Sequence, residues 1–267
     1  MILPSRGRQV GFTLMELIGV IAIIAILSAV IGPNLFQSID AALGKAEKSN
    51  LAALADGLKS YSQQAKAIPS GNAASWSSVV ASQVELPQAD VLTNGRGFTR
   101  GLYFDPRFLT TSDSNFPGYQ QISGLVNAPV SPRAILVSDL TRNAPSAPTN
   151  TAAFNAIWDQ DPSASVIEGP KVSIQRINFI PMFHRVVLNN QDTNQPAYAL
   201  EGGPQSAIPA ASGGLDGTLT RYVLDGSELR LYRASYPSGP LETSSLVSFD
   251  RHYRYATDGT NWYWERP

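Results

Sequence analysis

The chain has 267 residues, of which 43% are apolar and 15% are charged, and its formal net charge is −1. This length and apolar content suffice for one large domain or two small ones and argue against global disorder. The absence of cysteine excludes disulfides, thiolate metal sites and cysteine nucleophiles. Two histidines leave little for a histidine-dependent metal centre or active site.

The first 31 residues differ from the rest of the chain. An opening stretch whose only charges are Arg6 and Arg8 precedes twenty apolar-rich residues, 12–31, whose one charge is Glu16. As a helix this run is roughly 30 Å long, which matches the hydrocarbon core of a bilayer. Basic residues ahead of the run predict a transmembrane helix with a cytoplasmic N-terminus and the rest of the chain outside.

Glu16 needs an explanation in such a run, because a carboxylate there costs on the order of 3 kcal/mol to insert and is usually paired and functional. A secretory signal peptide and an ordinary anchor helix both leave Glu16 unexplained. No small-residue cleavage site follows the run, which also disfavours a signal peptide. The remaining alternative without a function is an uncompensated or protonated carboxylate.

The run Gly11-Phe12-Thr13-Leu14-Met15-Glu16 resembles the prepilin signature of type IV pilins and of the pseudopilins of type II secretion. The resemblance covers roughly residues 5–60 and says little about the remainder. It implies that prepilin peptidase, a membrane enzyme, removes a leader of residues 1–11 by cutting between Gly11 and Phe12. It also implies that the new N-terminal residue, Phe12, is then N-methylated.

The product implied by this resemblance provides a partner for Glu16. An α-amino group is normally protonated, since its reference pKa is about 8, and methylation keeps the charge. The Phe12 amine and Glu16 lie four residues apart, on one face of a helix. The resemblance implies that the pairing is made between subunits and guides filament assembly, with other pilin or pseudopilin subunits and an inner-membrane assembly platform as partners.

The helical pattern continues beyond the apolar run and predicts an amphipathic helix over residues 34–66. Its apolar positions are Leu35, Ile39, Leu43, Ala46, Leu51, Leu54, Leu58 and Tyr61. Gly32 and Pro33 join the two halves and predict a kink or local melting, because proline removes a backbone hydrogen bond. A pilin would use the first half of the stripe against neighbouring subunits and the second half against its own sheet.

Residues 67–267 are predicted to form a β-rich extracytoplasmic head. A short helix is expected at 76–84, and loops at 142–151 and 202–217. Strands are expected at 101–105, 133–140, 172–180, 183–188, 218–224, 228–233, 249–256 and 261–265. Asp225-Gly226 and Asp258-Gly259 each predict a hairpin. The expected fold class is α+β: a long N-terminal helix, membrane anchor plus amphipathic half, packed on an antiparallel sheet with long loops.

The head contains no recognisable catalytic motif, so we predict no catalytic residue, no metal and no cofactor. His184 and His252 lie on separate predicted strands and are interpreted as packing or surface residues. Asp159-Gln160-Asp161 is a weak calcium signal without the glycine and distal glutamate of an EF-hand.

The C-terminal segment is rich in aromatic residues: Tyr253, Tyr255, Trp262, Tyr263 and Trp264. We interpret them as cross-strand pairs that stabilise a hairpin, and an exposed contact surface is the alternative. Residues 67–267 carry 14 Lys and Arg against 17 Asp and Glu, so no nucleic-acid partner is predicted.

These observations favour a structural subunit of a type IV pilus-like or type II secretion filament, not an enzyme. The large head with long loops favours a minor pilin or pseudopilin. The expected location is the bacterial inner membrane and then a periplasmic or cell-surface filament. The alternatives are a single-pass membrane-anchored extracytoplasmic β-rich binding protein that keeps its N-terminus, and a tethered hydrolase, for which the sequence offers no nucleophile and base.

Overall fold

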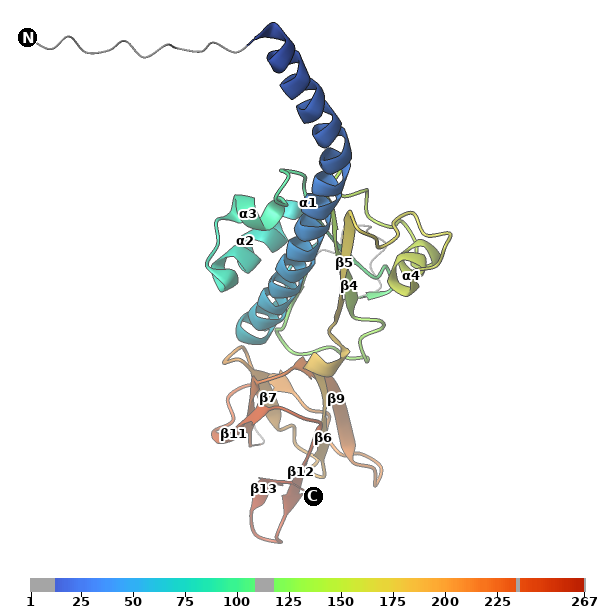
Figure 1. Cartoon of the computed structure of the whole chain (residues 1–267). Coiled ribbons are helices and arrows are strands. Elements are labelled where there is room, and N and C mark those ends of the chain that lie inside the picture. Colours follow the sequence, from blue (N-terminus) through green and yellow to red (C-terminus); the bar gives the residue numbers. More distant parts are fainter. Residues whose placement is uncertain (1–12, 109–117, 234–235, 267) are drawn as a thin grey trace, which may run out of the picture.

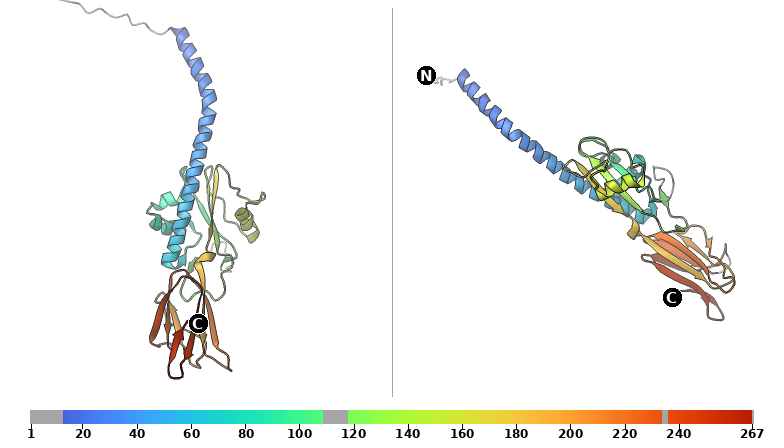
Figure 2. Two further views of the ribbon diagram at one scale, coloured as in Figure 1. Left: turned by 60° about the horizontal axis from the view of Figure 1, so that its bottom comes forward. Right: turned by 90° about the vertical axis from the view of Figure 1, so that its right-hand side faces the viewer.

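The structure is a computed structural model that describes residues 13–108, 118–233 and 236–266, with the side chains of residues 29–34 left out of the description. It is a mixed α+β protein (Figure 1). A long helix enters the head, and a strand-rich part lies beyond the end of that helix. Figure 2 shows the exposed helix, the first part of the head and the second part following one another along the molecule.

The long helix, α1, spans Leu14–Ala65 and begins with a capping box. The Thr13 hydroxyl accepts a hydrogen bond from the backbone N–H of Glu16 at 3.3 Å, and the Glu16 carboxylate accepts one from the backbone N–H of Thr13 at 2.9 Å. The helix ends at Lys66, whose φ of 49° is left-handed. The predicted end near Lys66 is therefore confirmed.

The first part of the head has three layers around an antiparallel sheet of order β2-β4-β5. The strands are β2 (Gly101–Phe104), β4 (Arg133–Asp139) and β5 (Val172–Asn178). The helices are α2 (Ala73–Val84), α3 (Gln88–Leu92) and α4 (Thr151–Asp159). One face of the sheet packs on α1 and α2 and the other on α4, so β4 is almost wholly buried.

The second part of the head is a β-sandwich of two four-stranded sheets, ordered β13-β12-β6-β9 and β11-β10-β7-β8. The first sheet contains β6 (Phe183–Asn190), β9 (Gly217–Leu224), β12 (Arg251–Thr257) and β13 (Trp262–Glu265). The second contains β7 (Ala197–Leu200), β8 (Ser206–Ala207), β10 (Ser227–Tyr232) and β11 (Leu241–Val247). Their facing side chains, such as Leu188 and Leu229, form one buried cluster.

The two parts of the head are joined by the 3-10 helix η2 (Ile180–Met182), between β5 and β6. A small sheet of β1 (Ala67–Ile68) and β3 (Tyr119–Gln120) lies at the end of α1. Met182 and Leu224 belong to the same buried cluster as Leu58 of α1. The core beneath α1 therefore extends to the junction with the sandwich.

The expected fold class is wrong in its architecture. The described strands form four sheets instead of one antiparallel sheet, and β6 and β12 run parallel. The reason is that the chain builds three apolar clusters: two lie on opposite faces of the β2-β4-β5 sheet, and the third lies between the two sheets of the sandwich. The helices α3 and α4, which were not predicted, also contribute to the head. The expected membrane anchor is also not found: within the described residues, no helix combines the length and the apolar character needed to cross a membrane.

The two predicted hairpins have different outcomes. Asp258-Gly259 joins the antiparallel strands β12 and β13, which confirms the second hairpin. Asp225-Gly226 is a tight turn, with φ of 70° at Gly226, but it is not a hairpin. It connects β9 in one sheet to β10 in the other, because each strand pairs elsewhere. The loop predicted at 202–217 contains the short strand β8.

Candidate functional site

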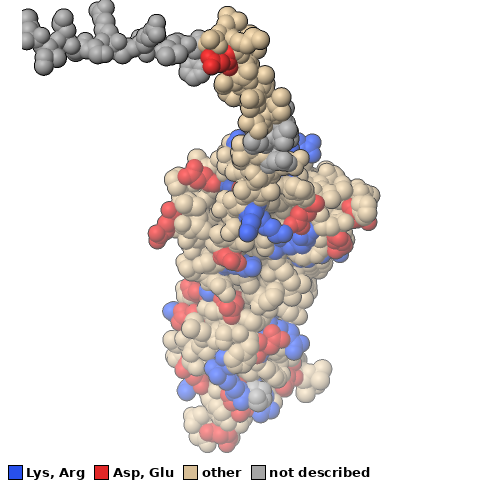
Figure 3. All heavy atoms as spheres, in the orientation of Figure 1, with Lys and Arg blue, Asp and Glu red and all other residues tan. Residues whose placement is uncertain are grey.

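The most unusual surface of the described molecule is the free end of α1. All sixteen residues 13–28 are exposed, and their large apolar side chains point to every side of the helix. Met15 is 82% exposed. Figure 3 shows this end of the helix as largely uncharged, whereas Lys, Arg, Asp and Glu are mixed over the visible face of the head. We call residues 13–28 the apolar helix segment.

Burial along α1 changes as the helix enters the head. Leu35, Phe36 and Ile39 are exposed, whereas Leu51, Leu54 and Leu58 are buried in the core. Most of the predicted apolar stripe follows this division, although Ala46 is exposed. The first half of the helix thus leaves large apolar side chains exposed, and the second half packs within the chain.

Glu16 has a local structural role that the sequence analysis missed. Its carboxylate accepts hydrogen bonds from both the backbone N–H and the hydroxyl of Thr13, each at 2.9 Å. The signal was present, because Thr13-x-x-Glu16 matches the capping-box pattern. Any assembly role of Glu16 must therefore be separated from its role as a helix cap.

The other residues singled out at the N-terminus are placed only in part. Gly11 and Phe12 lie outside the described residues. The helix α1 is continuous through Gly32 and Pro33, so the helix does not melt there. Figure 2 shows that the helix axis curves along its length.

Ion pairs hold α1 in a defined direction where it enters the head. Arg100 donates to the Glu47 carboxylate through Nε at 2.6 Å and Nη2 at 2.8 Å, and to two backbone carbonyls of α3. Both side chains of this pair are at least 97% buried. Nearer the free end of the helix, Asp40 pairs with Arg96 and Lys171. These contacts join residues that are distant in sequence, and no sequence motif predicts them.

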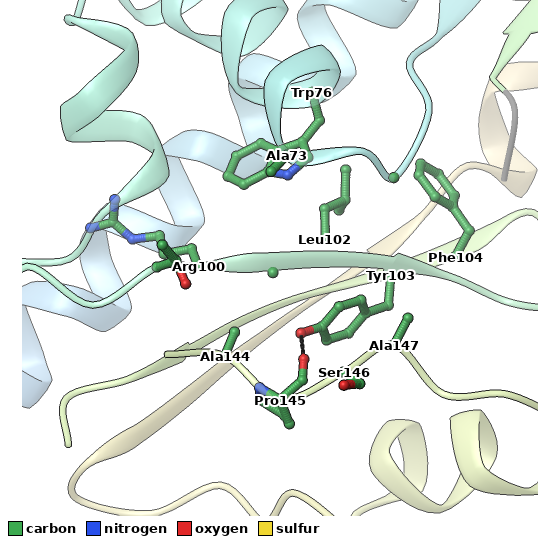
Figure 4. Close-up of a pocket in the computed structure, with 13 residues that line it drawn as sticks. Ala73, Trp76, Arg100, Leu102, Tyr103, Phe104, Ala144, Pro145, Ser146 and Ala147 are labelled. Atoms are coloured by element: carbon green, nitrogen blue, oxygen red, sulfur yellow. Dashed lines mark hydrogen bonds between the residues drawn. The ribbon is translucent and has the colours of Figure 1, made fainter. Parts of the chain in front are cut away.

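A cavity of about 250 Å³ lies between α2, β2 and the segment 144–147 (Figure 4). Its titratable lining side chains are Arg100, which points away toward Glu47, and Tyr103. The Tyr103 hydroxyl donates to the carbonyl of Pro145. Burial raises the pKa of Tyr103 to about 12, so this phenol stays protonated near neutral pH. The lining offers no paired nucleophile and base.

The remaining candidates are used in local structure. His184 Nε2 lies 3.0 Å from Asp225 Oδ1 at the turn between the sheets. Asp161 accepts from the backbone N–H and hydroxyl of Ser163. In the described part of the chain, no group of three or more His, Asp or Glu side chains is arranged to hold a metal ion.

The C-terminal aromatic residues pack largely as cross-strand partners. Tyr255 pairs with Trp264 in the register of β12 and β13, with ring centroids 5.1 Å apart. Tyr253 and Tyr255 are buried, and the indole of Trp264 donates to the Tyr232 carbonyl. The predicted cross-strand pairing in the hairpin is confirmed for Tyr255 and Trp264, whereas Tyr253 pairs instead with Leu188 of β6. Trp262 also borders a cavity.

Comparisons with known proteins give little further guidance. No family model matches the chain, and no curated protein matches it. A solved structure of pneumolysin is similar over 36% of this chain and 25% of its own length, at 8% sequence identity and a TM-score of 0.22. A likeness of that size carries no argument about fold or function.

Proposed function

We propose that the protein is a structural subunit, a minor pilin or pseudopilin, of a type IV pilus-like or type II secretion filament, and that it assembles through the apolar helix segment. The observation that carries the proposal is the run of sixteen exposed residues at the free end of α1, of which Glu16 alone is charged. A helix that is apolar all round requires burial on every side. A helical bundle of identical or similar subunits provides that burial.

The apolar surface is large enough to drive assembly. Full burial of a Leu, Ile, Val or Met side chain contributes roughly 1.5–3 kcal/mol. The apolar helix segment exposes Leu14, Met15, Leu17, Ile18, Val20, Ile21, Ile23, Ile24, Ile26 and Leu27. Partial burial of several of these side chains per subunit would offset the entropy lost on association.

The sequence before the helix supports the same function. The prepilin-like signature at residues 11–16 implies prepilin peptidase as the processing enzyme and Phe12 as the methylated N-terminus. In this proposal the Phe12 ammonium of one subunit pairs with Glu16 of a neighbour, the chain is a substrate and not an enzyme, and an assembly platform adds it to the filament. The head lies on the outside of a periplasmic or cell-surface filament.

The first test is the mass of the N-terminus in protein isolated from its native host. We expect a mature chain that begins with N-methyl-Phe12, identified by tryptic peptide mass. A chain that keeps its eleven-residue leader, or one cut beyond Ser28, would overturn the proposal.

The second test separates the charge of Glu16 from its capping role. Glutamine can replace glutamate in a capping box, so Glu16→Gln keeps the cap and loses the charge. We expect Glu16→Gln and Glu16→Ala to be processed normally and to reduce sheared filament yield by at least tenfold. Thr13→Ala, which loses the cap partner but keeps the charge, is the matched control and should assemble far better. Wild-type yield from Glu16→Gln would restrict Glu16 to helix capping.

A further inference from the structure

A second, larger cavity lies in the sandwich, on the side of the β12–β13 turn. Its volume is about 950 Å³. We call it the distal cavity, because the β12–β13 hairpin is at the end of the molecule away from the free end of α1 (Figure 1). It is bordered by residues 192–195 after β6, by Ala210, by Arg233, Tyr236 and Pro240 after β10, and by β12 and β13 with the turn between them. None of its lining residues belongs to the apolar helix segment.

Aromatic rings form one wall of the distal cavity. Trp262 stacks on the buried Tyr255, with ring centroids 5.5 Å apart and planes 20° apart. Since Tyr255 covers one face of this indole and Trp262 is partly exposed, the opposite face is the one available to a ligand. Tyr236, 43% exposed, lines the cavity from another loop.

A buried carboxylate lies in the lining. Asp192 is 96% buried, and its Oδ1 accepts hydrogen bonds from the backbone N–H and the side-chain amide of Asn194, each at 3.1 Å. Both of these hydrogen bonds are made to Oδ1, no described residue donates to the other oxygen, Oδ2, and Asp192 borders the cavity. A carboxylate that is fixed by hydrogen bonds to one oxygen can accept a hydrogen bond from a ligand hydroxyl at the other oxygen.

Amide and hydroxyl groups make up the rest of the polar lining. Asn194, Gln195 and Asn261 are exposed there, as are Thr193 and Thr260. Amides and hydroxyls both donate and accept hydrogen bonds, as the hydroxyls of a sugar do. The lining therefore combines the flat apolar ring of Trp262 with groups that can donate and groups that can accept hydrogen bonds.

We propose that the distal cavity binds a carbohydrate, with a sugar ring against Trp262 and a sugar hydroxyl donating to Asp192 Oδ2. The apolar C–H face of a pyranose matches an indole face, and its hydroxyls match the mixed amide lining. A metal ion needs several acidic or carbonyl ligands together, and the described residues hold no such acidic group. A phosphate ligand needs available cations, whereas the lining cation Arg233 already faces Glu242 at 3.4 Å.

This inference goes beyond the proposed function and does not depend on it. In a filament built through α1, the distal cavity would stay open to an outside glycan. Binding is measured on the isolated chain, so failure of assembly and failure of glycan binding are distinguishable.

The test uses the full chain in a detergent without a sugar headgroup. It is applied to an array of neutral and acidic oligosaccharides, and positives are titrated by tryptophan fluorescence. We expect binding to at least one oligosaccharide and a loss of roughly tenfold or more in affinity for Trp262→Ala and for Asp192→Asn. Tyr263→Ala, on the other face of the same strand, is the matched control and should bind as wild type.

Three results would overturn the proposal. They are no binding to any oligosaccharide of the array, binding that Trp262→Ala and Asp192→Asn leave unchanged, and saturable binding of choline chloride or CaCl₂ at the cavity in place of sugar. Far-ultraviolet circular dichroism and the urea midpoint of each variant check that the fold is retained. If Trp262→Ala is unfolded, Asn194→Ala, on an exposed loop, takes its place in the comparison.

Discussion

Arg100 and Glu47 form the most buried ion pair between α1 and the head among the described residues. The Arg100 guanidinium makes four hydrogen bonds, two of them to Glu47, in a site closed to solvent. Removing one partner of a buried pair costs about 3–5 kcal/mol, because the other charge is left unpaired. We therefore expect Arg100→Ala to lower the free energy of unfolding by that amount in urea denaturation.

Arg96→Ala is the matched control for this prediction. Arg96, in the head, pairs with Asp40, which lies on α1 as Glu47 does, but about a third of each side chain is exposed. An exposed pair contributes at most about 1 kcal/mol. Equal losses for Arg96→Ala and Arg100→Ala would contradict the importance assigned to burial.

Asp105 predicts a specific dependence of stability on pH. Burial by itself would raise the pKa of this carboxyl, but hydrogen bonds from Arg107 and Arg133 outweigh burial and lower the pKa below its ordinary value. A lowered pKa in the folded state stabilises the fold above the unfolded pKa of about 4, and this stability is lost as pH falls through the folded value. The urea midpoint of the wild-type protein should therefore decrease as the pH is lowered below about 4.

Asp105→Asn tests this assignment. The variant leaves two guanidinium groups without their carboxylate, so we expect it to be about 2–3 kcal/mol less stable at pH 7. Its urea midpoint should also vary less than that of wild type between about pH 4 and pH 2. Asp56→Asn, at an exposed helical site, should keep the wild-type profile. If the urea midpoint of Asp105→Asn fell with pH as steeply as that of wild type, the loss of stability in acid would have to come from other carboxyl groups.

The helix α1 lies unusually close to the head at Gly44. A Cβ built on Gly44 would be 2.4 Å from the carbonyl oxygen of Pro170, which is a backbone atom that cannot rotate away. Gly44→Ala should therefore push the loop that contains Pro170 away from the helix. This should destabilise the protein by about 1–3 kcal/mol, although alanine favours helices. Thermal unfolding would measure the loss.

Gly19 provides the comparison within the same helix. No atom lies within 4 Å of a Cβ built there, so Gly19→Ala should leave the unfolding of the head unchanged and favour the helix locally by about 1 kcal/mol. A Gly44→Ala variant that unfolds at the wild-type temperature would contradict this prediction, because it would show that the loop before β5 moves aside without loss of stability.

The molecule as a whole divides its apolar surface between folding and association. Among the described residues, the three buried clusters contain none before Leu51, so the apolar helix segment contributes to none of them. A chain that begins at Leu35 should therefore keep its free energy of unfolding in urea within about 0.5 kcal/mol of that of the full chain. It should also be monomeric without detergent, as measured by light scattering. Loss of cooperative unfolding would mean that the free end of α1 supports the head.

Features that depend on local chemistry could be predicted from the sequence. The end of α1 near Lys66, the division of β5 from β6 at Pro181 and the hairpin at Asp258-Gly259 each follow from residues within a few positions. The apolar run before Ser28 was equally plain in the sequence, because no pairing with distant residues is needed to see it. Its exposure on α1 is the basis of the proposed filament role.

The tertiary structure alone decided which elements meet. Asp225-Gly226 and Asp258-Gly259 carry the same turn signal, yet one joins two sheets and the other a hairpin. Glu47 and Arg100 are 53 residues apart, and the lining of the distal cavity brings together residues near positions 192–195, 210, 233–240 and 255–262. Local sequence sets where a strand or turn begins, but strand partners depend on which apolar faces are buried together, and that is a property of the folded chain.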